Sequence, residues 1–410
     1  MKENVLVNGG ALESSLEATL AVEQFLNENY LFRRNILNGK VEFVTKPSKE
    51  DAEASGGEVP VWETFTPRSL NSLVRRAKKD QVLKKGSPKT EIKEFIESDD
   101  IPVFNPIGEF LASLPKWNGQ NHIAKLFSRI PGVTTEQLGF LTTWFLSAVA
   151  HWQQKDTLHG NECVPTLIGD QGCGKTTFFK RLLPPELRQY FLDHLNLSNK
   201  FDKEMALTNN LLVCLDELEA IRPCQQAALK QTLSKSRVNG RPIYGASQED
   251  RPRFASFVAT TNNQQPLQDE TGSRRYICIS IPSGEFIDND GEIDYQQLYA
   301  QAVYELNEAK TPYWFNNDEV ARIQALNHVF MAQRDMKEMV ELTFRKPEKG
   351  EKAESMNSTM MLQLIQKKFT SLKIDHSAKI RLGLVMSDLH YDSKAHSNVS
   401  FYQVVPLKSA

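Results

Sequence analysis

Short apolar runs alternate with helix-length polar segments through the middle of the chain. Strands that are apolar on both faces, with helices between them, are typical of a parallel sheet covered on both sides. The pattern therefore predicts an α/β fold with a mostly parallel sheet and helices on both faces. The five apolar runs are Val164–Ile168, Tyr190–His194, Leu211–Asp216, Phe254–Thr261 and Tyr276–Ile281.

The segment before this sheet mixes helical and strand patterns. Residues 10–29 predict a helix, and Tyr30–Thr45 predicts two strands joined at Asn38-Gly39, a strong hairpin signal. Polar residues 46–59 predict a mobile loop. We therefore expect an α+β leader domain. The other helical patterns upstream of the sheet cover residues 66–98, 107–114 and 121–153.

The segment after the sheet is helical and ends in a small separate unit. Residues 294–310 and 317–343 predict helices, and the charged stretch Arg345–Glu354 predicts a linker. Two further helices, Met360–Phe369 and Ser377–Leu389, precede a hairpin at Tyr391–Val405. Helix, helix and hairpin in this order indicate a winged-helix-like domain. The expected domains are thus 1–105 (leader), 106–310 (α/β core with preceding helices), 311–356 (helical connector and linker) and 357–410 (winged-helix-like unit).

Composition narrows the class of protein. The 410 residues are 40% hydrophobic and 24% charged, with a net charge of −2, which is typical of soluble proteins. A globally basic nucleic-acid binder is excluded, although a local basic surface is not. The five cysteines form no CxxC pair, so we expect reduced thiols. The sequence has no apolar run of 18 residues, and we expect a cytoplasmic protein without membrane contact.

A glycine-rich loop after the first apolar run predicts a phosphate site. Gly169-xxxx-Gly174-Lys175-Thr176 has the spacing of a P-loop, between a strand and a helix amino terminus. Lys175 would contact the β- and γ-phosphates of ATP, and Thr176 would ligate Mg²⁺. Cys173 is either a reactive thiol or a passive filler. The expected nucleotide-binding residues are Gly169, Gly172, Cys173, Gly174, Lys175, Thr176 and Thr177.

Polar residues at the ends of two later strands complete the predicted site. Asp216 would hold Mg²⁺ with Thr176, and Glu217 would act as a general base toward water. Asn262 would orient the attacking water, or else it caps the following turn. The carboxyl ends of parallel strands meet at one edge of a sheet, so these residues are expected to gather near the glycine loop.

Two basic features remain open to two interpretations each. Arg274 and Arg275 precede the fifth apolar run and are either an arginine finger or sensor, acting within the chain or on a neighbouring subunit, or salt-bridge residues. Residues 230–253 carry Lys235, Arg237 and Arg241, with Asn239-Gly240 as a tight-turn signal. This segment is either a basic hairpin that contacts nucleic acid or a charged connector.

With these motifs placed, the chain resembles the virulence-associated E family of P-loop ATPases. The resemblance spans about residues 150–285 and rests on GDQGCGKTTFFKRL, FDKEMALTNNLLVCLDELEA, LKQTLSKSRVNGRPIYG and DETGSRRYICISI. It implies an ATPase related in plan to superfamily 3 helicases and carried by a mobile genetic element or prophage. Many relatives have a glutamate where this chain has Cys214. The identity of the carboxylate that holds the metal is therefore less firmly assigned than the role of Glu217.

Two functional classes follow from these observations. The first is a replication motor, a DNA helicase or initiation ATPase that acts on single-stranded DNA as a homo-oligomer, with a hexameric ring as one form. A separate primase or other replication protein would then be its partner, since no primase module is recognisable. The second is an ATP-dependent switch, for example in phage interference or defence.

Overall fold

The structure is a computed structural model, which separates the chain into two compact units. One unit comprises Met1–Pro115 with Thr208–Leu211, and the other comprises Lys116–Leu207 with Leu212–Ala410. Most of the expected loop at 46–59 lies outside the described residues. The described residues are 6–47, 61–221, 223–240, 249–269, 272–332, 335–348, 350–369, 372–396 and 399–407.

The amino-terminal unit is a small sheet packed against helices, as expected for an α+β leader. Strands β1 (Tyr30–Asn35) and β2 (Val41–Thr45) pair antiparallel, with Gly39 at a φ of 68° in the connecting turn. The sheet order is β3-β2-β1-β4, and β4 runs parallel to β1. The remaining elements are α1 (Leu6–Asn29), β3 (Glu63–Thr64), α3 (Pro67–Lys79), α4 (Lys89–Glu97), β4 (Val103–Phe104) and α5 (Pro106–Ala112).

A five-stranded parallel sheet forms the centre of the second unit. Its order is β11-β5-β10-β7-β6, and every pair is parallel. All residues of β5, β7 and β10 are buried, so both faces of the sheet are covered, as the apolar runs predicted. The strands are β5 (Val164–Ile168), β6 (Phe191–Leu192), β7 (Leu212–Leu215), β10 (Ser256–Thr261) and β11 (Tyr276–Ser280).

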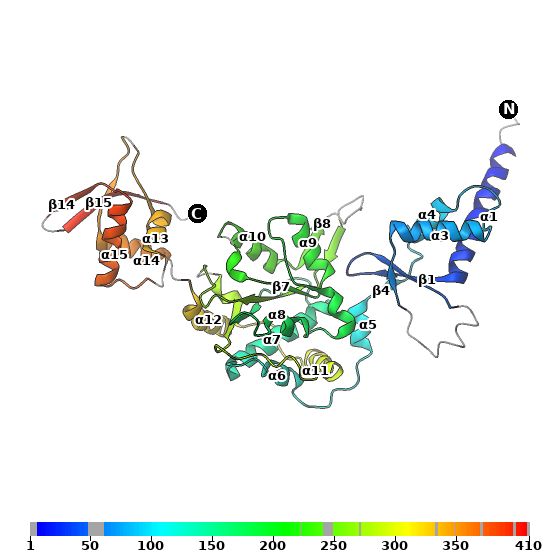
Figure 1. Cartoon of the computed structure of the whole chain (residues 1–410), viewed down its shortest axis with the longest axis horizontal. Coiled ribbons are helices and arrows are strands. Elements are labelled where there is room, and N and C mark those ends of the chain that lie inside the picture. The colour runs from blue at the N-terminus through cyan, green and yellow to red at the C-terminus, as the bar shows by residue number, and fades with distance from the viewer. Residues whose placement is uncertain are drawn as a thin grey trace. The chain divides into compact units, whose positions relative to one another are not determined.

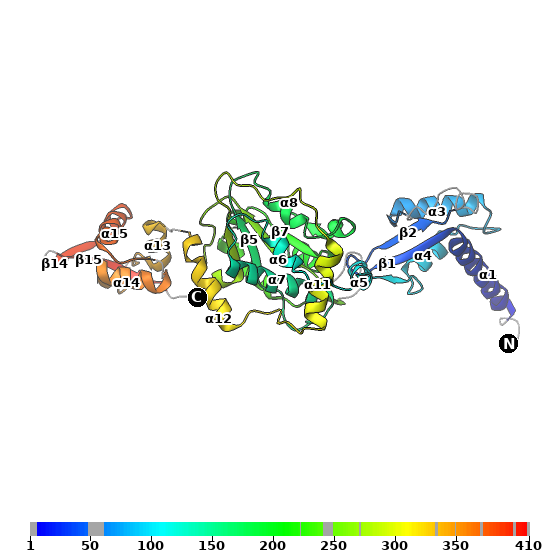
Figure 2. The ribbon, with the colours of Figure 1, turned by 90° about the horizontal axis from the view of Figure 1, so that it is seen from below.

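Helices flank this sheet above and below in Figure 1. Helix α7 packs on β5 and β11 and is itself covered by α6 and α11, whereas α8 packs on β10. Helix α8 lies on the same side of the sheet as α6, α7 and α11, which is the side that Figure 2 views, and the rings of Phe178 in α8 and Phe127 in α6 are 6.2 Å apart. The α-helices are α6 (His122–Phe127), α7 (Thr135–Trp152), α8 (Lys175–Lys180), α9 (Lys200–Asn209), α10 (Pro223–Ser234), α11 (Tyr295–Asn307) and α12 (Asn317–Leu326). The 3₁₀ turns are η1 (Pro185–Tyr190), η2 (Leu218–Ala220), η3 (Ser273–Arg275) and η4 (Asn327–Phe330).

Two local predictions were wrong. The helix expected over 317–343 is interrupted because the buried Asn327 side chain donates to the carbonyls of Ser273 and Tyr276, 2.7 and 2.6 Å away. This ties the chain to the start of β11. Asn239-Gly240 is no turn. Both residues lie in strand β8 (Arg237–Gly240), which pairs antiparallel with β9 (Glu249–Pro252).

The carboxy-terminal segment contains the expected order of two helices and a hairpin. Its hydrophobic core also includes α13, from Met336 on. Strand β15 (Val399–Pro406) pairs antiparallel with β12, β13 and β14. The other elements are α13 (Met336–Thr343), β12 (Phe344–Arg345), β13 (Glu354–Asn357), α14 (Ser358–Lys368), α15 (His376–Asp388) and β14 (Ser393–His396). Within the described part of the chain, none of the helices is long and apolar enough to cross a bilayer.

Candidate functional site

The carboxyl ends of β5, β7 and β10 meet around a cavity of about 270 Å³. Three sequence-distant motifs contribute to its walls, because the order β5-β10-β7 places their strand ends side by side. The structure therefore brings together most of the nucleotide-site residues expected from the sequence. The lining residues are Gln171, Gly172, Gly174, Lys175, Thr176, Thr177, Asp216, Glu217, Thr260, Thr261 and Asn262.

The glycine loop requires glycine at its last position for two reasons. Gly174 has a φ of 90°, which side chains disfavour, and it caps α8. A Cβ atom there would also lie 2.3 Å from Nδ2 of Asn289, which donates to the Gly174 carbonyl at 3.0 Å. A Cβ atom added at Gly169 would likewise lie close to a neighbour, 3.0 Å from the Cβ of Ile281. Cys173 is buried at 2% exposure, and its Sγ accepts a hydrogen bond from Lys175 Nζ at 3.7 Å.

Lys175 is a buried cation bonded by neutral oxygens. It is 7% exposed, and its Nζ donates to the carbonyls of Gly169 and Asp170, both at 2.8 Å, and to Oδ1 of Asn262 at 2.9 Å. Among the described residues, no carboxylate lies within ion-pair distance of this ammonium. A buried charge without a counter-charge is costly, so the cavity has the electrostatic character of an anion site.

The carboxylates at the end of β7 are fixed by threonines of β10. Thr260 donates to Asp216, and Thr261 donates to Glu219. Sequence reasoning gave no role to Thr260, Thr261 or Glu219. The signal for the two threonines was the polar triplet that ends with Asn262. Asp216 and Thr176 supply a carboxylate and a hydroxyl to one cavity, a donor set that suits Mg²⁺.

Cys214 cannot supply a negative charge to the cavity. It lies in β7 and is fully buried. Burial is the main cause that raises the pKa of its thiol to about 12, so the group is neutral at physiological pH. The described carboxylates that line the cavity are Asp216 and Glu217.

The loop after β11 supports the glycine loop through contacts that have no sequence signal. Ser283 Oγ and the Gly284 N–H donate to the Asp170 carboxylate at 2.8 and 3.2 Å, and these bonds lower its pKa. The Ile287 N–H donates to the Cys173 carbonyl at 3.1 Å. The Asp170 carboxylate therefore fixes the glycine loop to the loop after β11.

Arg274 and Arg275 lie away from this cavity. They precede β11, whose register places Tyr276 opposite Val164 and Ser280 opposite Ile168, so the arginines are at the amino ends of both strands. A five-residue strand spans roughly 13–17 Å at about 3.3 Å per residue. Arg275 forms an ion pair with Glu162 at 2.9 Å, the salt-bridge alternative, whereas Arg274 is exposed.

The basic segment forms the two-stranded β8–β9 hairpin outside the cavity. Lys235 lies 3.5 Å from Glu204, and Arg237 pairs with Asp250 at 2.7 Å. Arg241 lies outside the described residues. Arg253 is fully buried and donates to four main-chain carbonyls at 2.6–3.0 Å, those of Asn161, Leu233, Lys235 and Ala255. Its role is therefore structural.

Comparison with known families places this cavity inside a defined domain. The sequence profile of the virulence-associated protein E-like domain matches residues 111–332, more than half of the chain and all of the cavity. The chain belongs to this family. A comparison with curated proteins finds no match.

Among solved structures, the chain is similar to the NrS-1 C-terminal region. One apo structure of that region has a TM-score of 0.45 and 12% identity, covering 95% of this chain and 99% of the other. Its A-form apo structure has a TM-score of 0.44 and 11% identity, covering 95% and 100%.

Proposed function

We propose that this virulence-associated E-family chain binds and hydrolyses ATP with Mg²⁺. The observation that carries the proposal is Lys175, a buried ammonium bonded by neutral oxygens at the base of a glycine loop. A polyphosphate supplies the counter-charge that this environment calls for. The Gly174 position, at the start of α8, adds main-chain N–H groups that point toward an anion.

Each residue of the cavity then has a chemical task. Thr176 and Asp216 would hold Mg²⁺, which supplies charge neutralisation at the phosphates when bound. Lys175 would exchange the Asn262 oxygen for phosphate oxygens. Glu217, exposed at the end of β7, would accept a proton from water, and Asn262 would orient that water.

For the biological role we propose a DNA helicase or replication-initiation motor of a mobile genetic element or prophage, working on single-stranded DNA as a homo-oligomer. The helix–helix–hairpin order of residues 358–406 supports a winged-helix-like DNA contact. The ion pairs of Lys235 and Arg237 favour the alternative, an ATP-dependent switch, because they neutralise one cation just before the β8–β9 hairpin and one within it.

The test measures phosphate release and ATP binding for three variants, with and without single-stranded DNA. We expect Lys175→Ala to lower turnover by about 100-fold or more, and Glu217→Gln to do the same while ATP affinity is retained. Lys180→Ala is the matched control, because Lys180 is exposed on the same helix and does not line the cavity. Full turnover by Glu217→Gln would refute the proposed base.

The DNA arm separates the motor from the switch. A motor predicts that single-stranded DNA raises turnover and that its affinity falls with salt, at a log–log slope of about −0.7 per neutralised phosphate. ATP turnover that does not change on addition of single-stranded DNA, at either low or high salt, would favour the switch.

A further inference from the structure

A second cavity, of about 770 Å³, lies at the opposite end of the central sheet. Its walls are the end of α7, the segment Lys155–Cys163, the pair Arg274–Arg275 and the segment Tyr313–Val320. Cys163 and Arg275 directly precede β5 and β11, so this cleft is at the amino ends of the strands whose carboxyl ends border the nucleotide cavity.

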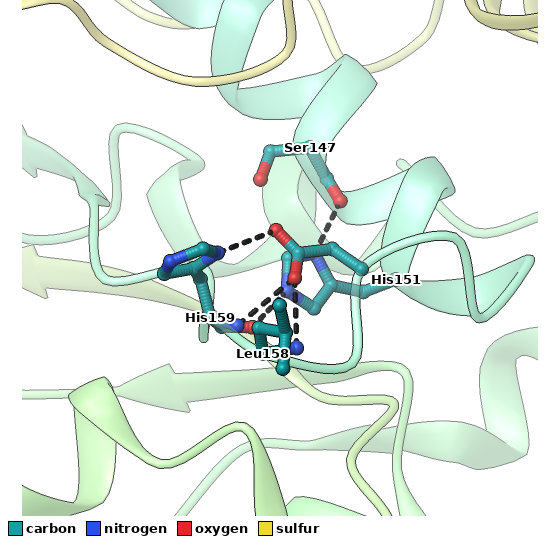
Figure 3. Close-up of polar contacts among 5 residues, drawn as sticks. Ser147, His151, Leu158 and His159 are labelled. Carbon is teal, nitrogen blue, oxygen red and sulfur yellow. Dashed lines mark hydrogen bonds and ion pairs between the residues drawn. The ribbon is translucent and has the colours of Figure 1, made fainter.

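Hydrogen bonds fix one wall of this cleft, as Figure 3 shows. The ring nitrogens of the buried His151 face the carbonyl oxygens of Ser147 and His159, at 2.7 and 2.9 Å. The carboxylate of Asp156 accepts the main-chain N–H groups of Leu158 and His159, both at 2.9 Å. The wall is therefore preorganised.

The surface of the cleft combines apolar side chains with positive charge. Leu158 is 81% exposed and Trp314 is 61% exposed. Lys155 and Arg274 are exposed cations of the lining, whereas the carboxylates of Asp156 and Glu162 are engaged by His159 and Arg275. This cleft fits an acidic segment that carries an exposed aromatic side chain.

Such a segment exists in the same chain. The loop Gly284-Glu-Phe-Ile-Asp-Asn-Asp-Gly-Glu-Ile-Asp294 contains five acidic residues and no basic one. Its Phe286 is 70% exposed. The loop is anchored beside the nucleotide cavity, because Ile287 donates to Cys173, Asn289 donates to Gly174, and Arg129 donates to the Gly291 carbonyl at 2.8 Å.

The loop follows β11 and the cleft precedes it, so the two surfaces lie at opposite ends of one strand and cannot meet within a molecule. We propose that the cleft of one copy receives the Phe286 loop of a second copy. Phe286 would pack on Trp314 and Leu158, and the acidic residues would face Lys155 and Arg274. Because the two surfaces differ, the contact is head-to-tail, and repetition generates a ring or a filament.

The proposed contact rests on the proposed function in one respect, because the loop borders the proposed ATP site. Its test measures self-association and not ATP turnover. Sedimentation velocity of the full chain is measured with and without ATP and Mg²⁺. We expect Phe286→Asp and Trp314→Asp each to weaken self-association by at least about tenfold. Two exposed positions that belong to neither surface serve as controls, Leu384→Asp and Lys125→Glu, and should associate like the parent protein.

Mixing the two variants distinguishes a head-to-tail contact from any symmetric one. A Phe286→Asp subunit retains its cleft, and a Trp314→Asp subunit retains its loop, so the mixture has one intact combination of surfaces. At a concentration where the tenfold weakening leaves each variant alone monomeric, we expect the equimolar mixture to form dimers and no larger species.

Several outcomes would overturn the inference. They are a parent protein that is monomeric under all these conditions, unchanged association of either variant, or a mixture that stays monomeric. Loss of DNA binding in Trp314→Asp with normal assembly would instead assign the cleft to nucleic acid. Failure of ATP hydrolysis would leave the sedimentation result interpretable, so the two proposals fail separately.

Discussion

Glu217 has a proposed catalytic side chain and a backbone conformation that is unfavourable for a residue other than glycine. Its φ of 52° lies in the left-handed region, which costs a non-glycine residue roughly 1–3 kcal/mol. The turn is fixed on both sides, by buried β7 before it and by Leu218, 3% exposed, after it. Strain at a polar residue of a cavity suggests that the side chain is retained for chemistry.

Replacing Glu217 by glycine should therefore stabilise the protein while it removes hydrolysis. We expect Glu217→Gly to gain about 1 kcal/mol, which raises the midpoint of thermal unfolding by about 2–4 °C for a domain of this size. Glu217→Gln keeps the strained backbone and should leave the midpoint unchanged. Differential scanning calorimetry compares the three proteins. Equal midpoints for the glycine and glutamine variants would show that the backbone is relaxed at this position.

The residues of the proposed nucleotide cavity were predictable where a motif carries them. The glycine loop, Asp216-Glu217 and Asn262 each follow an apolar strand, and parallel pairing brings strand ends together. Asn289 could not be predicted, because it reaches Gly174 from a loop 115 residues away that has no motif of its own. The separation of Arg274 and Arg275 from the cavity follows from strand direction, which sequence spacing alone left open.

At the scale of elements, the end of α7 and the segment after it depend on His151. Burial is the largest influence on this imidazole and lowers its pKa below 6.5, together with the nearby positive charge of Arg253. The carbonyls of Ser147 and His159 and the carboxylate of Asp156 act in the opposite direction and only partly compensate. The unfolded chain therefore takes up a proton at a higher pH than the folded one.

The sign of the resulting pH dependence follows directly. The stability contributed by neutral His151 is complete above about pH 6.5 and is lost as the pH falls through the lowered pKa of the folded protein. We expect the unfolding midpoint to decrease between pH 7.5 and 5.5 more steeply for the parent protein than for His151→Gln, which has no titrating group. Chemical denaturation at several pH values measures the difference. Parallel curves would contradict a buried neutral imidazole.

Element boundaries were only partly predictable. The helical patterns 66–98 and 121–153 each contain two helices with an unpredicted break between them, and elsewhere a tertiary contact overrides the local pattern. The apolar periodicity of 317–343 continues past Asn327, but two side-chain hydrogen bonds to the start of β11 end the helix there. Asn239-Gly240 has turn-forming residues, yet the ladder with β9 extends through both. In each case a partner distant in sequence decided the conformation.

At the scale of the whole molecule, the position of Arg274 bears on how the proposed ATPase site would be completed. Arg274 is exposed at one end of β11, and the cavity lies at the other end, so an action on ATP requires a second subunit. We expect mixtures of Lys175→Ala and Arg274→Ala subunits to recover part of the hydrolysis that each lacks alone. Steady-state phosphate release from mixtures of varied ratio measures this recovery. Full turnover by Arg274→Ala alone would exclude the role.

The hydrogen bond between Lys175 and Asn262 has a consequence beyond the nucleotide cavity. Asn262 begins a segment that reaches Leu267, whose N–H donates to the Phe330 carbonyl and whose carbonyl accepts from Ala332, at 3.1 and 2.7 Å. Residues 330–332 lead out of the core toward α13. A ligand that takes the place of the Asn262 oxygen at Lys175 would free this side chain at the start of the segment. By thermodynamic reciprocity, a partner of the carboxy-terminal segment whose affinity is changed by nucleotide would change nucleotide affinity by the same factor.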